Sequence, residues 1–325
     1  MLVDIRRVEW PYAAIFRISG RAEMSADGVQ IELRDGTFLG RGEAYGVFYH
    51  GETADSILAQ LESIKADLFQ GVSRAELQSL LRPGGARNAV DCALWDLEAK
   101  RAGKRAWELA GMASVRRITS DFTLSLDTPD TMALAAARFR SYQKLKLKLG
   151  GEGDIERVAA VRTVRPDAEI IVDANQAWNE RQLGEFIPKL AELGVKLVEQ
   201  PLPVGQDSVL ANYDGPVPIC ADESCQTRAS LPALAGKYKY INIKLDKAGG
   251  LTEGLALARE AKAHGFGLMV GCMCGSSLAM APHFIIGQHC EFVDLDGPLL
   301  STTDMPYPIK YDGGTMSLPA AALWG

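Results

Sequence analysis

The sequence lacks the features that most readily mark secreted, membrane and nucleic-acid-binding proteins. No apolar run approaches the roughly 18 residues of a membrane-spanning helix, and the start, MLVDIRRVEWPYAAIFRISG, has no uninterrupted apolar stretch behind a basic segment. Lys and Arg form no basic tail, and the net charge is −6, which does not indicate a nucleic-acid surface. We therefore expect a cytoplasmic protein that binds neither membranes nor nucleic acid.

Cysteine is present, but not in a pattern that indicates disulfides or a zinc site. The six are Cys92, Cys220, Cys225, Cys272, Cys274 and Cys290. They form no C-x-x-C pair and have no zinc-ligand spacing with the four histidines. We expect buried, reduced thiols.

The first part of the chain reads as strands followed by helices. The length of 325 residues exceeds that of one small core, and 47% hydrophobic with 23% charged residues is ordinary for a globular protein. GVQIELRDGTFLGRGEAYG indicates two strands joined at Asp35–Gly36. DSILAQLESIKADLF and ARNAVDCALWDLEAKRAG have helical spacing, and Gly103 suits a helix end. An α+β module is predicted.

After about residue 115, short β-like runs alternate with helical segments. Eight such runs with helices between most of them predict parallel strands and a (β/α) barrel. The segment between Pro201 and Pro216 has little helical pattern, so the sequence does not define that unit. The runs are ITSDFTLSL, KLKLKLG, AEIIVDA, VKLVEQPL, VPICADES, YINIKLD, FGLMVGCM and EFVDLD.

The run KLKLKLGG alternates lysine with leucine and allows two interpretations. In a strand, Lys144, Lys146 and Lys148 share one face and the leucines the other. The lysines could lie in water on a half-exposed strand, since Lys is rarely buried unpaired. Alternatively, they point into a site.

Charged residues at the ends of five consecutive β-like runs favour the second interpretation. Lys148, Asp173, Glu199, Asp222 and Lys244 are separated by 22 to 26 residues, about one βα unit each. In a parallel barrel, the carboxyl ends of all strands open on one face, where the active sites of this fold lie. These side chains are therefore predicted to form a ring around one mouth.

Three carboxylates in this ring indicate a cation site. Asp173, Glu199 and Asp222 would repel one another in a confined space unless a cation neutralises them, and an all-oxygen set suits Mg²⁺. Each carboxylate could instead cap the helix that follows its strand. Their regular spacing between two lysine strands favours the metal.

The lysines on either side of the acids suggest acid–base chemistry. Lys146 and Lys148 precede the acids and Lys244 follows them, so the two groups would face each other across the mouth. Two bases on opposite faces of one carbon can remove a proton from one side and return it on the other. We assign no catalytic role to Lys144, which lies deeper or at the strand start.

Together these motifs closely resemble the enolase superfamily, in its muconate-lactonizing-enzyme-like subgroup. The resemblance covers nearly the whole chain, and motifs that are individually weak become specific in this order. They are GRGEA, ALWDLEAK, KLK at 146–148, VDANQAW, VEQPL, ADES and IKLDKAGGLTE. It implies a (β/α)7β modified TIM barrel over residues 116–305 and an N-terminal α+β capping domain over 1–115. The tail, about 306–325, is expected to pack back on the cap.

The resemblance also implies roles for the ring. Asp173, Glu199 and Asp222 would bind Mg²⁺, and Lys148 and Lys244 would be the two acid–base catalysts. Lys146 would lower the pKa of Lys148 and touch the substrate carboxylate. The superfamily uses a Lys or His base with Mg²⁺ to stabilise an enediolate. The reaction would thus remove a proton α to a carboxylate and pass through an enolate.

The last barrel strand, EFVDLDGPLL, bears on the substrate. Asp294 and Asp296 form a D-x-D pair that resembles the ammonium-binding pair of the dipeptide epimerases, although two acids at a strand end could also lie in solvent or cap a helix. Thr123 and Cys272 are likewise assigned to substrate binding. Gly275 stands where many relatives have a larger side chain, which leaves the shape of the N-terminal residue's pocket open.

The cap is expected to contact the other end of the dipeptide. In FRISGRAEMS, Arg21, or else Arg17, could fork onto a substrate carboxylate such as that of Glu. The alternative is an ordinary surface arginine. Aromatic residues in AYGVFYHGET would line the lid or pack between cap and barrel; these are Tyr45, Phe48, Tyr49 and, with them, His50.

Three hypotheses follow. The first is a Mg²⁺-dependent dipeptide epimerase, an isomerase acting by 1,1-proton transfer on the C-terminal residue, with L-Ala-D/L-Glu as leading substrate and cell-wall peptide recycling as context. The second keeps the fold but makes the protein a cycloisomerase, o-succinylbenzoate synthase or N-acylamino-acid racemase. The third is a non-catalytic, metal-stabilised binding protein. A homo-oligomer is common in the family, but no interface is visible in the sequence.

Overall fold

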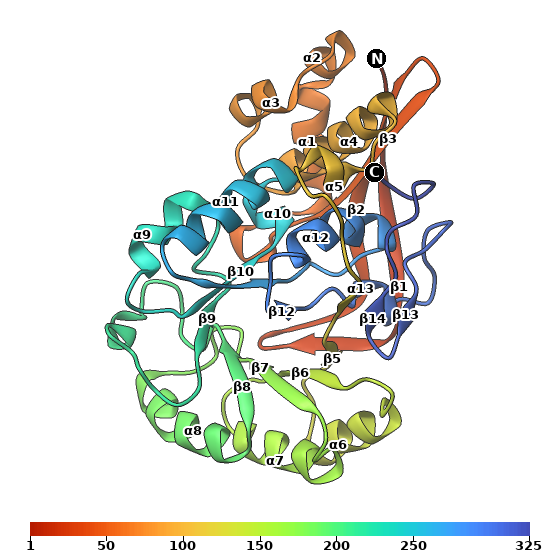
Figure 1. Ribbon diagram of the computed structural model, residues 1–325. Coiled ribbons are helices and arrows are strands. Elements are labelled where there is room, and N and C mark those ends of the chain that lie inside the picture. The colour runs from red at the N-terminus through yellow and green to blue at the C-terminus, as the bar shows by residue number, and fades with distance from the viewer.

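The computed structural model describes all residues from Met1 to Gly325 and contains three sheets (Figure 1). One is a three-stranded antiparallel sheet near the N-terminus, one is an eight-stranded parallel sheet, and one is a small sheet formed by the tail. No helix of the structure is both long and apolar enough to span a membrane. All six cysteines are free.

The N-terminal part is an antiparallel sheet covered by helices. The strands β1 (Leu2–Ile18), β2 (Arg21–Asp35) and β3 (Phe38–Tyr45) pair in sequence order, and the predicted turn at Asp35–Gly36 joins the last two. Gly42 is required by close packing, since a Cβ there would lie 2.0 Å from the Ala89 carbonyl oxygen of α4 (Gly85–Ala102). The helical elements are η1 (Phe48–His50), α1 (Ala54–Ser63), α2 (Lys65–Gln70), α3 (Arg74–Leu80), α4 (Gly85–Ala102) and α5 (Ala106–Leu109).

The helices of this part begin and end where the sequence provides caps. Thr53 and Ser73 form capping boxes at the starts of α1 and α3. Gly103 ends α4 in the left-handed conformation, as its position predicts. The single helical pattern predicted from DSILAQLESIKADLF is interrupted at Ile64, which is the C-cap of α1 and the N-cap of α2.

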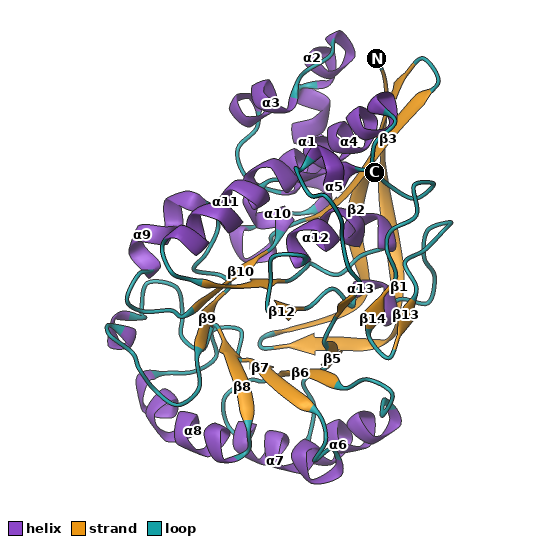
Figure 2. Ribbon diagram, in the orientation of Figure 1, coloured by secondary structure: helices purple, strands orange, loops and turns teal.

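The second part is the predicted series of eight parallel strands. They lie in chain order within one curled sheet, and helices cover its outside (Figure 2). The two edge strands meet where the Asp121 N–H donates to the Val293 carbonyl oxygen at 2.7 Å. The strands are β5 (Phe122–Leu124), β6 (Lys144–Lys148), β7 (Glu169–Asp173), β8 (Val195–Glu199), β9 (Ile219–Ala221), β10 (Tyr240–Ile243), β11 (Gly267–Val270) and β12 (Phe292–Val293).

Helices follow seven of these eight strands, and β8 is the exception. There, the segment that has little helical pattern in the sequence contains only a single 3₁₀ turn, η2 (Ser208–Leu210). The other elements are α6 (Pro129–Arg138), α7 (Asp154–Val164), α8 (Glu180–Glu192), η3 (Arg228–Ser230), α9 (Leu231–Leu234), α10 (Leu245–Ala248), α11 (Leu251–Ala263), α12 (Ser277–Gly287) and α13 (Gly297–Leu300).

The chain ends against the N-terminal part. A small antiparallel sheet joins β4 (Ile118–Thr119), β13 (Tyr311–Asp312) and β14 (Thr315–Met316). Beyond it, the Trp324 indole N–H donates to the Cys92 carbonyl oxygen at 3.1 Å, and the Gly325 N–H donates to Asp96 at 2.6 Å. Two large apolar clusters, one under the N-terminal sheet and one around the barrel, are separate. The boundary near residue 115 stays a prediction.

The interior of the barrel is layered because side chains alternate along each strand. Ile171, Leu197, Cys220 and Met269 form a buried apolar cluster contributed by four strands. Two residues further along β7, β8 and the β9 strand end, the same face carries Asp173, Glu199 and Asp222. The charged ring therefore lies directly above an apolar floor, at the carboxyl ends of the strands.

Candidate active site

Three of the five ring residues line one cavity. It has a volume of about 270 Å³ and lies between the mouth of the barrel and two cap segments, the β1–β2 hairpin and the turn around Tyr49. Lys148, Asp222 and Lys244 line it from the barrel, as do Thr123, Cys272, Asp294 and Asp296. Arg21 lines it from the cap. Asp173, Glu199 and Lys146 lie beneath, fully buried.

Each lysine of the ring is paired with a carboxylate of the ring. Lys148 Nζ lies 2.7 Å from Asp173 Oδ2, and Lys244 Nζ lies 2.7 Å from Asp222 Oδ2. The inward interpretation of KLKLKLGG is therefore the one observed for Lys146 and Lys148. Lys144, by contrast, is half-buried at the start of β6 and pairs with Glu169 at 2.9 Å.

Lys146 is the most connected of these groups. Its Nζ lies 2.6 Å from Asp294 Oδ2, 2.7 Å from Glu199 Oε2 and 3.2 Å from Asp173 Oδ2. One ammonium group thus joins the acids of β7 and β8 to the D-x-D pair. Sequence reasoning placed Lys146 beside Lys148 but did not predict these contacts, which depend on the curvature of the sheet.

The three ring carboxylates have the chemistry of a cation site. In this structure, however, each is paired with a lysine, and the three do not converge on one point. No group of three His, Cys, Asp or Glu side chains is arranged to hold a metal ion. The carboxylates are nevertheless an all-oxygen set, and buried Glu199 Oε2 accepts no hydrogen bond, because the nearby Lys146 Nζ is not aligned to donate one. Small movements of the lysine side chains would open Asp173, Glu199 and Asp222 to a hard cation such as Mg²⁺.

Electrostatics within the ring differ from residue to residue. Burial and the charge of Asp173 raise the pKa of Glu199 to about 7. Burial opposes ionisation of Asp173 too, but Lys148 and Lys146 outweigh it and lower the pKa of Asp173 to about 2. Burial opposes the charge of Lys244, yet Asp222 and Glu199 raise its pKa well above the usual value. Without a bound cation, Lys244 therefore keeps its proton and can act only as an acid.

The D-x-D pair lies beside β5. The Thr123 N–H donates to Asp296 Oδ2 at 2.6 Å, and the Thr123 hydroxyl donates to Asp294 Oδ1 at 3.3 Å. Burial and the charge of Asp294 raise the pKa of Asp296 to about 7. Two nearly buried carboxylates on the pocket wall have the chemistry to hold a cationic group.

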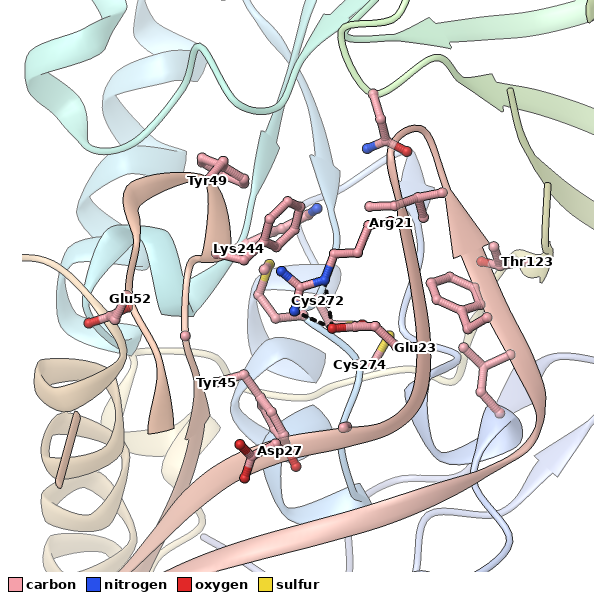
Figure 3. A pocket seen from close by; sticks show the side chains of 18 of the residues that line it. Arg21, Glu23, Asp27, Tyr45, Tyr49, Glu52, Thr123, Lys244, Cys272 and Cys274 are labelled. Carbon is pink, nitrogen blue, oxygen red and sulfur yellow. Dashed lines mark hydrogen bonds and ion pairs between the residues drawn. The ribbon is translucent and has the colours of Figure 1, made fainter. Parts of the chain in front are cut away.

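The cap supplies a cation to the opposite wall. Arg21, at the start of β2, donates through Nε to Glu23 Oε1 at 2.7 Å and also pairs with it through Nη2. Its guanidinium lies 4.3 Å from the centre of the Phe48 ring. Figure 3 shows the Arg21–Glu23 pair in the pocket. Arg17, the alternative, pairs instead with Asp127 at 3.5 Å.

Aromatic side chains and a glycine shape the rest of the cap side. Tyr45, Phe48 and Tyr49 line the pocket, whereas His50 does not. Gly275 has φ +102°, and a Cβ there would lie 2.3 Å from the Tyr45 ring. Tyr45 therefore occupies the space that a larger residue at 275 would need, which explains the departure noted in the sequence.

Three residues near the site escaped the sequence analysis. Glu223 and Asn175 line the pocket, and Glu223 Oε2 and Asn175 Oδ1 are buried without a hydrogen-bond partner. Burial and the charge of Asp222 raise the pKa of Glu223 to about 8. Lys247 donates to Asp222 from behind the ring. The motifs ADES, VDANQAW and IKLDKAGG contain these residues, but only the fold distinguishes them from their neighbours.

Comparison with known proteins places these features in a family. Residues 2–111 match the N-terminal domain of the mandelate racemase / muconate lactonizing enzyme family, and residues 130–322 match the enolase C-terminal domain-like family. An L-Ala-D/L-Glu epimerase of Escherichia coli K12 is 42% identical, covering 97% of this chain and 99% of that protein. An N-acetyl-D-glutamate racemase of a Pseudoalteromonas species is 40% identical, covering 91% and 95% respectively.

Solved structures agree with the sequence comparison. A crystal structure from Agrobacterium tumefaciens has a TM-score of 0.97 and 43% identity over 99% of both chains. It is described as an enolase family member with homology to dipeptide epimerases, with sodium and L-Ala-L-Glu bound. A dipeptide epimerase from Enterococcus faecalis, complexed with Mg and L-Leu-L-Tyr, has a TM-score of 0.92 and 27% identity over 99% and 98% of the chains. This chain belongs to the enolase superfamily, with the N- and C-terminal domains of the mandelate racemase / muconate lactonizing enzyme family, and its close relatives are epimerases and racemases.

Proposed function

We propose that this protein is a Mg²⁺-dependent dipeptide epimerase that inverts the α-carbon of the C-terminal residue, with L-Ala-D/L-Glu as the leading substrate. The observation that carries the proposal is one cavity in which Lys148 and Lys244, at the ends of separate strands, flank buried carboxylates, while an acid pair lies close by. Relatives with bound dipeptides, two of them with Mg, support it.

The two lysines would perform the proton transfer. One lysine, uncharged, takes the α-proton, and the electron pair of the C–H bond moves into the carboxylate to give an enolate. The other lysine, as an ammonium, returns a proton to the opposite face of the same carbon. Atoms and charge balance, because the lysines exchange protonation states and nothing is oxidised.

Asp173, Glu199 and Asp222 would hold Mg²⁺, which when bound supplies positive charge for the carboxylate oxygens of the reacting residue. Lys244 is strongly basic while it faces Asp222 and Glu199 alone. It would need to lose these partners, or gain a cation nearby, to act as a base near neutral pH.

The remaining contacts would fix the dipeptide at both ends. Asp294 and Asp296 would accept the α-ammonium group, held in place by Thr123. Arg21 would exchange Glu23 for the side-chain carboxylate of a C-terminal Glu, because a guanidinium binds carboxylates through two parallel donors. Cys272 lines the same cavity and would contact the substrate. A cytoplasmic location, a role in cell-wall peptide recycling and a homo-oligomer stay predictions.

A second candidate is racemisation of N-acylated glutamate. The relative at 40% identity is an N-acetyl-D-glutamate racemase, whose substrate shares the glutamate but lacks the ammonium group. Asp296→Asn separates the two candidates. It should greatly lower activity on L-Ala-L-Glu if Asp296 binds an ammonium, and hardly change activity on N-acetyl-glutamate.

Proton NMR in D₂O tests the proposal directly. Pooled L,L-dipeptides, N-acetyl-L-glutamate and Mg²⁺ are incubated with the protein, and the loss of each α-proton signal is followed. Exchange restricted to the C-terminal α-carbon of dipeptides is expected. Silence across the dipeptides, with exchange only in N-acetyl-glutamate, would overturn it in favour of the racemase. Thermal stabilisation by Mg²⁺ without any exchange would indicate a non-catalytic binding protein.

A further inference from the structure

Asp294 contacts Lys146 in a way that its neighbour Asp296 does not. Lys146 Nζ donates a hydrogen bond to Asp294 Oδ2 at 2.6 Å. Asp296 makes no ion pair with Lys146, and its Oδ2 accepts from the Thr123 backbone instead. The two acids of the D-x-D pair are therefore not equivalent.

Two ring carboxylates, those of Glu199 and Asp173, also attract the ammonium group of Lys146. Nζ lies 2.7 Å from Glu199 Oε2, but the geometry is not that of a hydrogen bond, and this oxygen has no other donor. Asp173 Oδ2 is more distant, at 3.2 Å. Lys146 is thus drawn to Asp294 by a formed hydrogen bond and to the other two acids by charge alone.

The attraction between Lys146 and these carboxylates is strong because all of the side chains are buried. Lys146, Asp173 and Glu199 are 0% exposed and Asp294 is 6% exposed. In such surroundings, charges interact much more strongly than in water. If the ammonium group of Lys146 bound only to Glu199 and Asp173, it would repel a divalent cation from the same oxygens.

We infer that Asp294 is a positioning residue for Lys146: its carboxylate holds the ammonium group by a hydrogen bond and so keeps this group from settling fully on Glu199 and Asp173, whose oxygens would bind the cation. The inference rests on the proposed Mg²⁺ site, but not on the nature of the substrate. It gives Asp294 a task that is performed before any dipeptide binds, whereas Asp296 serves the ligand alone.

The affinity for Mg²⁺ alone provides the test. Chelator-treated protein is titrated calorimetrically with Mg²⁺ in the absence of dipeptide. Asp294→Asn should raise the Kd about 10- to 100-fold, the range found when a side chain that supports a metal site without binding the metal is removed. Asp296→Asn is the matched control, since it makes the same acid-to-amide change two residues away, where the side chain makes no ion pair with Lys146. Equal Kd values for the two variants would overturn the inference.

A double-mutant cycle shows whether Asp294 acts through Lys146. Lys146→Met should tighten Mg²⁺ binding, because the competing cation is gone, and in that background Asp294→Asn should weaken binding no more than Asp296→Asn does. If Asp294→Asn keeps its full effect without Lys146, or if Lys146→Met fails to tighten binding, the inference is wrong. Where Asp294→Asn does not fold, Asp294→Ser with its control Asp296→Ser provides the same comparison.

These results are separable from the outcome for the function. Wild-type protein that binds Mg²⁺ but exchanges no dipeptide α-proton would contradict the proposed reaction and leave the comparison of Kd values intact. Conversely, an active epimerase in which both Asn variants bind Mg²⁺ equally well would keep the function and contradict the role of Asp294.

Discussion

Lys247 Nζ lies 2.5 Å from Asp222 Oδ1, and two backbone carbonyl oxygens hold it there, that of Asp222 at 2.5 Å and that of Asn242 at 3.0 Å. The other oxygen of Asp222 faces Lys244 at 2.7 Å. A buried, anchored ammonium group therefore fixes one side of the carboxylate. Only the Asp222 oxygen that faces Lys244, Oδ2, is left to exchange this lysine for another cation.

Replacing Lys247 by Met should destabilise the protein by about 3 kcal/mol, because a buried charge pair loses one member and two carbonyl oxygens lose their donor. Urea unfolding measures the change. Lys100→Met is the matched control, since Lys100 also holds one carboxylate and one carbonyl, Asp96 and Leu39, but lies on α4 and is 26% exposed. Equal losses in the two variants would contradict the prediction.

Removing either proposed catalytic lysine should stop epimerisation. Lys148→Ala and Lys244→Ala each lack one of the two groups needed to pass a proton across the α-carbon, so turnover of L-Ala-L-Glu should fall at least about 100-fold. Proton NMR also shows whether the remaining lysine still exchanges one isomer. Lys144→Ala alters the same strand but removes only a half-buried ion pair with Glu169. Its turnover should stay close to that of the unaltered protein, and full activity in the first two variants would exclude the two-base mechanism.

Arg21 should set the preference for an acidic C-terminal residue. Arg21→Met should raise the KM for L-Ala-L-Glu about 10- to 100-fold, the range expected for a lost charge-assisted hydrogen bond, and leave the KM for L-Ala-L-Leu nearly unchanged. Steady-state assays with both dipeptides measure the ratio. Arg17→Met provides the control, because Arg17 pairs with Asp127 and does not line the pocket. A parallel rise for both dipeptides would show that Arg21 acts through its contact with Phe48 in the cap rather than on the substrate side chain.

The sequence predicts the ring but not its connections. Residues such as Asp173 and Glu199 could be placed together because one βα unit separates them and parallel strands open on one face. The contacts of Lys146 with Asp294 and of Lys247 with Asp222 join segments 148 and 25 residues apart. Their geometry depends on sheet curvature and on the start of α10, which no local pattern specifies.

The same limit applies to the cap. The hairpin at Asp35–Gly36 and the end of α4 follow from turn and capping chemistry, which are local. The pairing of Arg21 with Glu23, by contrast, depends on how the β1–β2 hairpin reaches the barrel, where the Arg17 N–H donates to Ser125 Oγ at 2.7 Å. The sequence therefore identified Arg21 as a candidate without revealing its partner.

Asp246 should make the stability of the metal-free protein depend on pH. It lies between cap and barrel, where its Oδ1 accepts from the Tyr45 N–H and the Asn88 amide, both at 2.9 Å. Burial raises the pKa of Asp246 from 3.8 to about 7. The folded state thus keeps a proton that the unfolded chain releases near pH 4.

The sign follows from proton binding. Because the folded state binds more protons between about pH 4 and pH 7, the stabilisation from this group is complete below pH 4 and is lost as the pH rises through 7. Asp246→Asn removes the titration, so its Tm in chelator should fall less than that of the unaltered protein between pH 5 and pH 8. The difference in slope is at most about 1.4 kcal/mol per pH unit, the value for one proton. Parallel Tm curves for the two proteins would show that Asp246 is already ionised when folded.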